Sequence, residues 1–184
     1  MMGKEVLIVI DVQTAVMEQG YNRDETIDRI SKLIRNAREG KIPVVYVQHE
    51  YPEGIMKRGE FGWKLHERLE QPLQQETIIY KTVPNAFADT NLKEILDQIN
   101  ATHLYICGAQ TDFCVDSTCR GAFDLHYDVT LITDAHTTNN NDLLSAPQII
   151  KHTQNTLGNF WSPNATISLK GSSEINWMKK EVEG

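Results

Sequence analysis

Three ionisable side chains stand where predicted buried strands end. Asp11 follows the apolar run EVLIVI, Lys81 closes the short run TIIYK, and Cys114 lies in the turn that follows HLYIC. In a doubly wound α/β sheet, the carboxyl ends of the parallel strands meet along one edge, where binding sites form. A thiol, a carboxylate and an ammonium at one edge would suit acyl transfer, because the sulfur can attack a carbonyl while the carboxylate moves the proton.

Cys114 decides whether this chemistry is available. Apolar residues recur after it at helical spacing, which predicts a helix over residues 114–126. A thiol at a helix N-terminus lies at the positive end of the helix dipole, and a nearby Lys81 would depress its pKa further. Backbone N–H groups of the turn 109–114 would face a developing oxyanion. Spacing alone leaves a nucleophile and a packed core cysteine equally open.

The other two cysteines have a simpler interpretation. Cys107 stands inside a strand and Cys119 on the apolar stripe of the helix, so both are predicted to lie in the core. Cys114 and Cys119 point to different sides of a helix with ~100° per residue, so no disulfide is expected between them. The chain has 3 cysteines and no C-x-x-C pair, which predicts neither a disulfide framework nor a structural zinc site.

Strands and helices alternate around these residues. Apolar runs predict strands at 5–12, 42–48, 77–81, 102–107, 128–133 and 165–169, and helical periodicity predicts helices at 24–41, 92–99, 114–126 and 145–157. Strand–helix–strand units close right-handed with parallel strands. We therefore expect an α/β fold with a doubly wound, mostly parallel sheet of five to six strands. The length of 184 residues predicts a single domain over 1–184.

The composition and net charge of the chain indicate which kinds of molecule it could bind. The chain is 40% hydrophobic and 23% charged, with a net charge of −7, and no Lys/Arg cluster stands out. These features argue against nucleic acid as a partner. No apolar stretch approaches the length of a membrane span, and the N-terminus lacks the pattern of a signal peptide. A cytoplasmic protein without membrane partners is expected, with a small molecule as its substrate.

The segment 49–76 breaks the alternation. It contains three Gly, two Pro and several aromatic residues before the strand at 77–81. A long, Gly-punctuated segment at a strand's carboxyl end often builds a binding site, and a surface excursion with a short helix at 63–70 is an equal alternative. Phe61, Trp63 and the later Phe87 could wall a flat substrate or pack in the core.

Three segments together resemble the isochorismatase-like cysteine hydrolases, the superfamily of nicotinamidases, N-carbamoylsarcosine amidases and bacterial isochorismatases. They are IVIDVQ near the start, Lys81 followed by NAFADTNL, and ICGAQTDFCVDSTCRGAFDLHYDVTLITDAH at 106–136. The match covers nearly the whole chain in the right order, and G-x-x-T-x-x-C-V after a buried strand is a specific signature.

The resemblance implies a three-layer α/β/α fold and a catalytic triad of Cys114, Asp11 and Lys81. It implies a cis peptide bond between Ala109 and Gln110, with the N–H groups of Gln110 and Cys114 as the oxyanion hole. His136, in the DAH loop, would line the pocket or cap a turn. Members of the family often form homo-oligomers, so a homodimer or larger assembly is expected, with Trp161 as a candidate interface residue.

The sequence departs from the nicotinamidases at their metal site. Those enzymes carry Asp-x-His after the second strand, whereas here Val47 stands two residues before His49. His49 and His66 could still share one site, but two nitrogen ligands fall short of the three protein ligands of a catalytic zinc. No metal and no other cofactor is therefore predicted.

The leading hypothesis is a metal-independent cysteine hydrolase that cleaves a small amide, carbamoyl or ureido substrate through a thioester on Cys114. The alternatives are a nicotinamidase with a non-standard metal site, an isochorismatase-type enol-ether hydrolase, and a non-catalytic flavodoxin-like binding domain. The binding domain is disfavoured because DVQTAVMEQG, after the first strand, has no Gly-rich phosphate-binding pattern.

Overall fold

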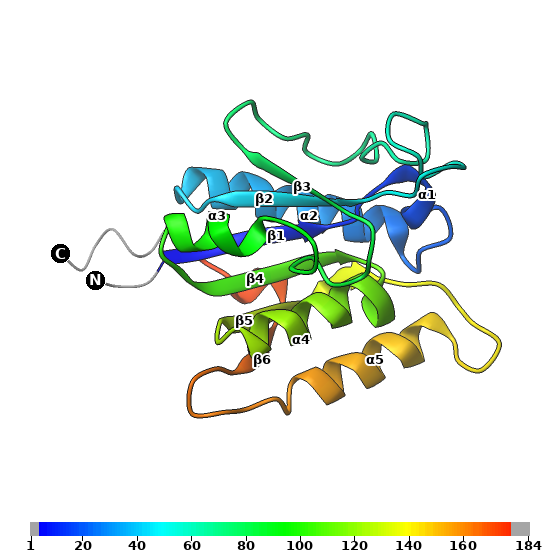
Figure 1. Ribbon diagram of the computed structural model, residues 1–184. Helices are drawn as coiled ribbons and strands as arrows, with labels where there is room; N and C mark the ends of the chain where they lie inside the picture. The colour runs from blue at the N-terminus through cyan, green and yellow to red at the C-terminus, as the bar shows by residue number, and fades with distance from the viewer. Residues whose placement is uncertain (1–3, 178–184) are drawn as a thin grey trace.

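A computed structural model describes residues 4–177, and a six-stranded sheet lies at its centre (Figure 1). The order across the sheet is β3-β2-β1-β4-β5-β6, and every neighbouring pair is parallel. The strands are β1 (Lys4–Ile10), β2 (Val44–His49), β3 (Thr77–Lys81), β4 (Ala101–Ala109), β5 (Asp128–Thr137) and β6 (Ile167–Lys170). The predicted parallel, doubly wound sheet is confirmed.

Helices cover both faces of this sheet. They are α1 (Thr14–Met17), α2 (Arg23–Glu39), α3 (Leu92–Gln98), α4 (Asp116–Asp124) and α5 (Ala146–Leu157), with a π-helical turn η1 (Thr111–Val115) before α4 and a 3₁₀ turn η2 (Ser172–Glu174). Buried residues of α3, α4 and α5 pack on one face, and those of α1 and α2 pack on the other. The layering is therefore α/β/α, as the resemblance implies.

The alternation of side chains along β1 explains why its sequence is apolar throughout. Val6, Ile8 and Ile10 belong to the core on the α3–α5 face, whereas Leu7 and Val9 belong to the core on the α2 face. Successive residues of a strand point to opposite faces, and here both faces are covered. The apolar run thus fixes β1 at the centre of the sheet.

The strand order reverses between β1 and β4, which makes their carboxyl ends the switch point of the fold. Ile10 and Gly108 are register partners at this point. Gly108 has φ +124°, and a Cβ placed on it would lie 2.0 Å from the Ile10 carbonyl oxygen. Only glycine lets the two backbones approach this closely, so Asp11 and the turn that carries Cys114 emerge side by side.

The segment between β2 and β3 forms turns and isolated bridges, and the short helix considered at 63–70 is not present. Besides turns within the segment, its backbone bonds to the chain after β1: Thr14 N donates to the Lys64 carbonyl, and His66 N donates to the Val12 carbonyl. These bonds hold the segment against the carboxyl edge of the sheet. Among residues 4–177, no helix has the length and apolarity needed to cross a membrane.

Candidate active site

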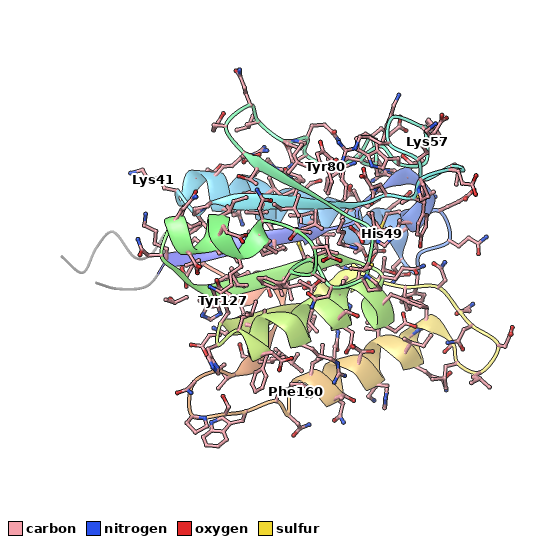
Figure 2. All side chains as sticks on the ribbon, in the orientation of Figure 1. Lys41, His49, Lys57, Tyr80, Tyr127 and Phe160 are labelled. Atoms are coloured by element: carbon pink, nitrogen blue, oxygen red, sulfur yellow. The ribbon has the colours of Figure 1, made fainter. Side chains whose placement is uncertain are left out.

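The ammonium of Lys81 is the centre of a buried polar cluster at the carboxyl edge of the sheet. Its Nζ lies 2.7 Å from Asp11 Oδ2, 2.9 Å from His49 Nδ1 and 3.1 Å from Cys114 Sγ. A lysine ammonium has three N–H donors and no acceptor. Each donor of Lys81 therefore has one partner. Figure 2 shows His49 toward this end of the sheet, where β2 ends.

The fold explains why these residues meet. Asp11 follows β1 directly, in a left-handed conformation with φ +48°. Lys81 and His49 are the last residues of β3 and β2 and are register partners. Cys114 is the fourth residue of η1, the turn that leads from β4 into α4. The structure thus brings together Asp11, Lys81 and Cys114, the three residues singled out at the ends of strands.

Burial sets the protonation of the nucleophile and its neighbour. Loss of hydration raises the pKa of Asp11, although the Lys81 charge opposes this shift. Burial, followed by the charge of Asp11, raises the pKa of Cys114 to about 12, again against Lys81. The prediction of a depressed Cys114 pKa is therefore wrong for the resting site. The single ammonium does not offset desolvation and a neighbouring carboxylate.

His49 is the member of this cluster whose place the sequence analysis missed, because it was weighed only as a metal ligand. The side chain is 7% exposed, and burial together with Lys81 lowers its pKa to about 4. Gln13 fixes the backbone of His49, accepting from its N–H at Oε1 and donating from Nε2 to its carbonyl, each at 2.8 Å. The signal that was available is that His49, a polar residue, ends a fourth strand, β2.

The cluster does not fit a metal ion. Among residues 4–177, one group of potential ligands gathers closely, namely Asp11, His49 and Cys114, with donor atoms within 4.8 Å of one another. The Lys81 nitrogen already bonds to all three of these residues. The positively charged ammonium therefore occupies the position that a metal ion would take. His66 lines a separate cavity beside α1 and α2, and the lining of the Cys114 cavity includes His49 but not His66.

A cavity of about 330 Å³ opens beside Cys114. It is at the small end of the volumes that hold small-molecule ligands. Its polar lining residues are Asp11, His49, Gln110 and Cys114. The remaining lining residues are Ala15, Val16, Tyr51, Met56, Pro84 and Phe113. The arrangement can hold a small, partly apolar molecule against the sulfur.

The four side chains expected to contact substrate lie outside this cavity. Phe61 is 71% exposed and lines the separate cavity of His66. Trp63 stacks on Tyr80, with ring centroids 5.8 Å apart. Because a loop without periodicity gives no side-chain direction, the sequence could not place these two. The aromatic residues that do line the cavity are Tyr51 and Phe113.

The side chains of Phe87 and His136 contact other parts of the fold and do not face the cavity. Phe87 packs against the core and stacks on Tyr127 at 5.9 Å. His136 is buried in β5, where its Nδ1 lies 2.8 Å from Thr111 Oγ1 and its Nε2 lies 3.0 Å from Gln154 Nε2. It joins η1 to α5 and neither caps a turn nor lines the cavity.

The backbone beside the nucleophile and the remaining cysteines match their predicted features. The peptide bond between Ala109 and Gln110 is cis. Gln110 and Cys114 both line the cavity. Cys107 and Cys119 are fully buried, and all three cysteines are free.

The chain resembles known proteins in both sequence and fold. A family model described as the Isochorismatase domain matches residues 5–153, which include all of Asp11, His49, Lys81 and Cys114. The chain belongs to the isochorismatase family. A crystal structure of an isochorismatase family protein superimposes with a TM-score of 0.79 and 32% identity, covering 89% of this chain and 96% of the other.

Two of the curated relatives are named as hydrolases. The chain is 36% identical over 149 residues to a streptothricin hydrolase from Streptomyces noursei, covering 79% of this chain and 53% of the relative. It therefore spans about half the length of that protein. It is also 26% identical over 169 residues to a ureidoacrylate amidohydrolase from Serratia proteamaculans, covering 70% of this chain and 68% of the relative.

Proposed function

We propose that this isochorismatase-family chain is a metal-independent cysteine hydrolase that cleaves a small amide, carbamoyl or ureido compound through a thioester on Cys114. The observation that carries the proposal is the Lys81 ammonium, bonded at once to Asp11 and to the Cys114 sulfur on the wall of a small cavity. The names of the two relatives support an amide-type substrate.

The raised pKa of Cys114 defines the first step, because the sulfur carries its proton at rest. The ion pair with Lys81, at 2.7 Å, favours Asp11 as the carboxylate that accepts this proton, and Asp11 Oδ1 is buried without a hydrogen-bond partner among the described residues. As the sulfur attacks the carbonyl carbon, Asp11 accepts the thiol proton. The carbonyl oxygen becomes an oxyanion, which the backbone N–H groups of Gln110 and Cys114 would stabilise. Lys81 stabilises the negative charge that moves between sulfur and carboxylate.

The second step releases the amine. Protonated Asp11 donates its proton to the departing nitrogen, the C–N bond breaks, and the acyl group remains on Cys114 as a thioester. Water then attacks the thioester while Asp11 accepts one of its protons, and the departing sulfur is reprotonated. The products are a carboxylic acid and ammonia or an amine, or carbamate-derived products from a ureido substrate, and the enzyme returns to its starting state.

The alternatives lack an observation of comparable weight. Enol-ether hydrolysis does not require a cysteine nucleophile, whereas Cys114 lies within 3.1 Å of a buried ammonium. A pure binding domain has no need of a carboxylate, an ammonium and a thiol sequestered together. A nicotinamidase-type metal would lack its carboxylate ligand, because Val47 stands two residues before His49.

Ammonia release from a panel of primary amides, ureas and carbamoyl compounds tests the proposal. Replacement of Cys114 by Ala is expected to lower turnover at least a thousandfold or so, since it removes the nucleophile. Cys119→Ala is the matched control, because Cys119 is a thiol packed in the core away from the cavity. Rapid quenching and mass spectrometry should find an acyl adduct on Cys114, and activity should survive prolonged EDTA treatment. Turnover by the Cys114→Ala protein would refute the thioester route.

A further inference from the structure

His49 presents a hydrogen-bond donor that the catalytic cycle above does not use. Lys81 has no acceptor, so its 2.9 Å contact with His49 Nδ1 requires that nitrogen to be unprotonated. Burial and the Lys81 charge keep the ring neutral, with a pKa of about 4. A neutral imidazole carries one proton, which must then be on Nε2, on the side of the ring away from the ammonium.

The Nε2–H group lacks a partner. It is a buried atom without a hydrogen-bond partner among residues 4–177, on a side chain that is 7% exposed and lines the cavity beside Cys114. Buried polar atoms in folded proteins are nearly always satisfied, and an exception calls for an explanation. A ligand acceptor in the cavity would supply the missing partner.

The charges around the cavity exclude an anion. Asp11 lines the cavity, whereas none of the lining residues is an arginine or a lysine. Lys81 has its three donors engaged and is only 2% exposed. Arg58, on the neighbouring loop, is paired with both carboxylate oxygens of Glu50 at 2.7 and 2.9 Å. A substrate carboxylate in the cavity would face Asp11 without a counter-ion, which is a costly arrangement.

We propose that the cavity selects an uncharged amide that carries a second hydrogen-bond acceptor, and that the Nε2–H of His49 binds this acceptor. The inference rests on the proposed function for the identity of the reacting group. His49 is accordingly a specificity-determining residue as well as a partner of Lys81.

Three amides of nearly equal size separate the contribution of the hydrogen-bond acceptor from that of the charge. 4-Oxopentanamide is neutral with a ketone acceptor, pentanamide is neutral without one, and succinamate replaces the methyl ketone with a carboxylate. We expect kcat/KM for 4-oxopentanamide to exceed that for pentanamide about three- to tenfold, the effect of one neutral hydrogen bond. Succinamate should be at least about a hundredfold poorer than 4-oxopentanamide, because its charge is buried unpaired.

Two variants test whether the preference for the ketone amide depends on Nε2 of His49. In His49→Asn the side-chain oxygen can take the place of Nδ1 and accept from Lys81, but no donor remains at the Nε2 position. In His49→Gln the amide nitrogen can reach the Nε2 position, while the acceptor for Lys81 is lost. The ratio of 4-oxopentanamide to pentanamide turnover should therefore fall to about one in the Asn variant and persist in the Gln variant. A ratio within one variant is insensitive to a general loss of activity.

Ligand-observed NMR with the Cys114→Ala protein measures the affinity for each of the same three amides. Because this variant lacks the nucleophile, the affinities report ligand selection without turnover. Failure of the proposed function would abolish ammonia release and leave the binding order intact. Equal affinity for succinamate and 4-oxopentanamide, including no measurable affinity for any of the three, overturns the selection. An Asn variant that keeps the ketone preference overturns the role of His49.

Discussion

At the scale of single residues, the protonation of Cys114 makes a prediction about its alkylation. With a pKa of about 12, the thiolate fraction should rise about tenfold per pH unit across the neutral range. Iodoacetamide labelling should therefore accelerate steadily from pH 6.5 to 9.5. Peptide mapping should still find Cys114 labelled ahead of Cys107 and Cys119, because these two have no exposed surface.

Replacement of Asp11 by Asn should accelerate this labelling, since the Asp11 charge raises the Cys114 pKa. At pH 7.5 we expect an increase of about tenfold or more. Lys81→Met serves as the opposing control and should slow the reaction, because Lys81 lowers the same pKa. A labelling rate that reaches a plateau below pH 7 in the unaltered protein would contradict a raised pKa.

The sequence was informative about the nucleophile and less so about its surroundings. Asp11, Lys81 and Cys114 could be found because each ends a recognisable apolar run or follows one. His49 also ends such a run, but its value depends on meeting Lys81 across the β2–β3 register, which periodicity does not report. Desolvation of Cys114 likewise depends on packing from several segments, so its effect on the pKa was not foreseen.

At the scale of elements, His136 joins the nucleophile turn to a helix, and we predict that this connection weakens in acid. Burial lowers its pKa from an ordinary value near 6.5 to about 4. The unfolded chain therefore binds a proton that the folded chain refuses, and the stability present above pH 6.5 is lost as the pH falls toward 4. Each such histidine contributes a slope of up to ~1.4 kcal/mol per pH unit.

Urea unfolding between pH 7.5 and 4.5 measures this dependence. His136→Gln should lower the free energy of unfolding at pH 7.5, because Thr111 and Gln154 lose their partner. It should also flatten the acid limb by about 1 kcal/mol per pH unit. His152→Gln, at an exposed position of α5, is the control. If the free energy of unfolding fell as steeply with decreasing pH in His136→Gln as in the control, this role of His136 would be refuted.

The junction of β1 and β4 yields a second prediction at this scale. Gly108→Ala should prevent stable folding or destabilise strongly, because the new Cβ meets the Ile10 backbone at 2.0 Å. Gly59→Ala is the matched control, since Gly59 also has a positive φ, +93°, but no atom within 4 Å of the new Cβ. The control should lose only about 1–2 kcal/mol, the cost of the left-handed conformation. If urea unfolding gave similar losses of stability for Gly108→Ala and Gly59→Ala, the close approach of β1 and β4 would not be the reason that Gly108 is needed.

The regular elements could be predicted because their apolar periodicity is strong. The structure differs mainly at their ends: β5 continues through His136, and η1 precedes α4. These extensions depend on pairing with β4 and on contacts to α5, which are long-range features. The segment between β2 and β3 has no periodicity, and its course is set by bonds from Gln13 and Gln48 to the Trp63 carbonyl.

At the scale of the whole molecule, the site lies where the sheet reverses its strand order, and three different strands supply it. Asp11 and Cys114 follow the adjacent strands β1 and β4, whereas Lys81 reaches the same point from β3, two strands from β1. Removing any one of these three strands from the sheet would therefore dismantle the site. This arrangement makes catalysis depend on complete folding, because no local segment holds the triad by itself.

The outer side of α5 leads to a prediction about assembly. Leu143, before α5, and Trp161, after it, are 89% and 72% exposed. Figure 1 shows α5 at the opposite side of the sheet from the segment between β2 and β3. Large exposed apolar groups on a folded surface favour burial against another protein surface. We propose that the segments before and after α5 form part of a homo-oligomer interface, the assembly that the family resemblance leads us to expect.

Size-exclusion chromatography with light scattering, at micromolar concentration, should report at least a dimer. Trp161→Ser should shift the population toward monomer, because truncation of a central aromatic residue at an interface commonly weakens association by 2 kcal/mol or more, roughly thirtyfold. Phe61→Ser is the matched control, since Phe61 is equally exposed, at 71%, but belongs to the segment between β2 and β3. It should leave the mass unchanged. A monomer in the unaltered protein, or equal effects of both substitutions, would remove the segments before and after α5 from the proposed interface.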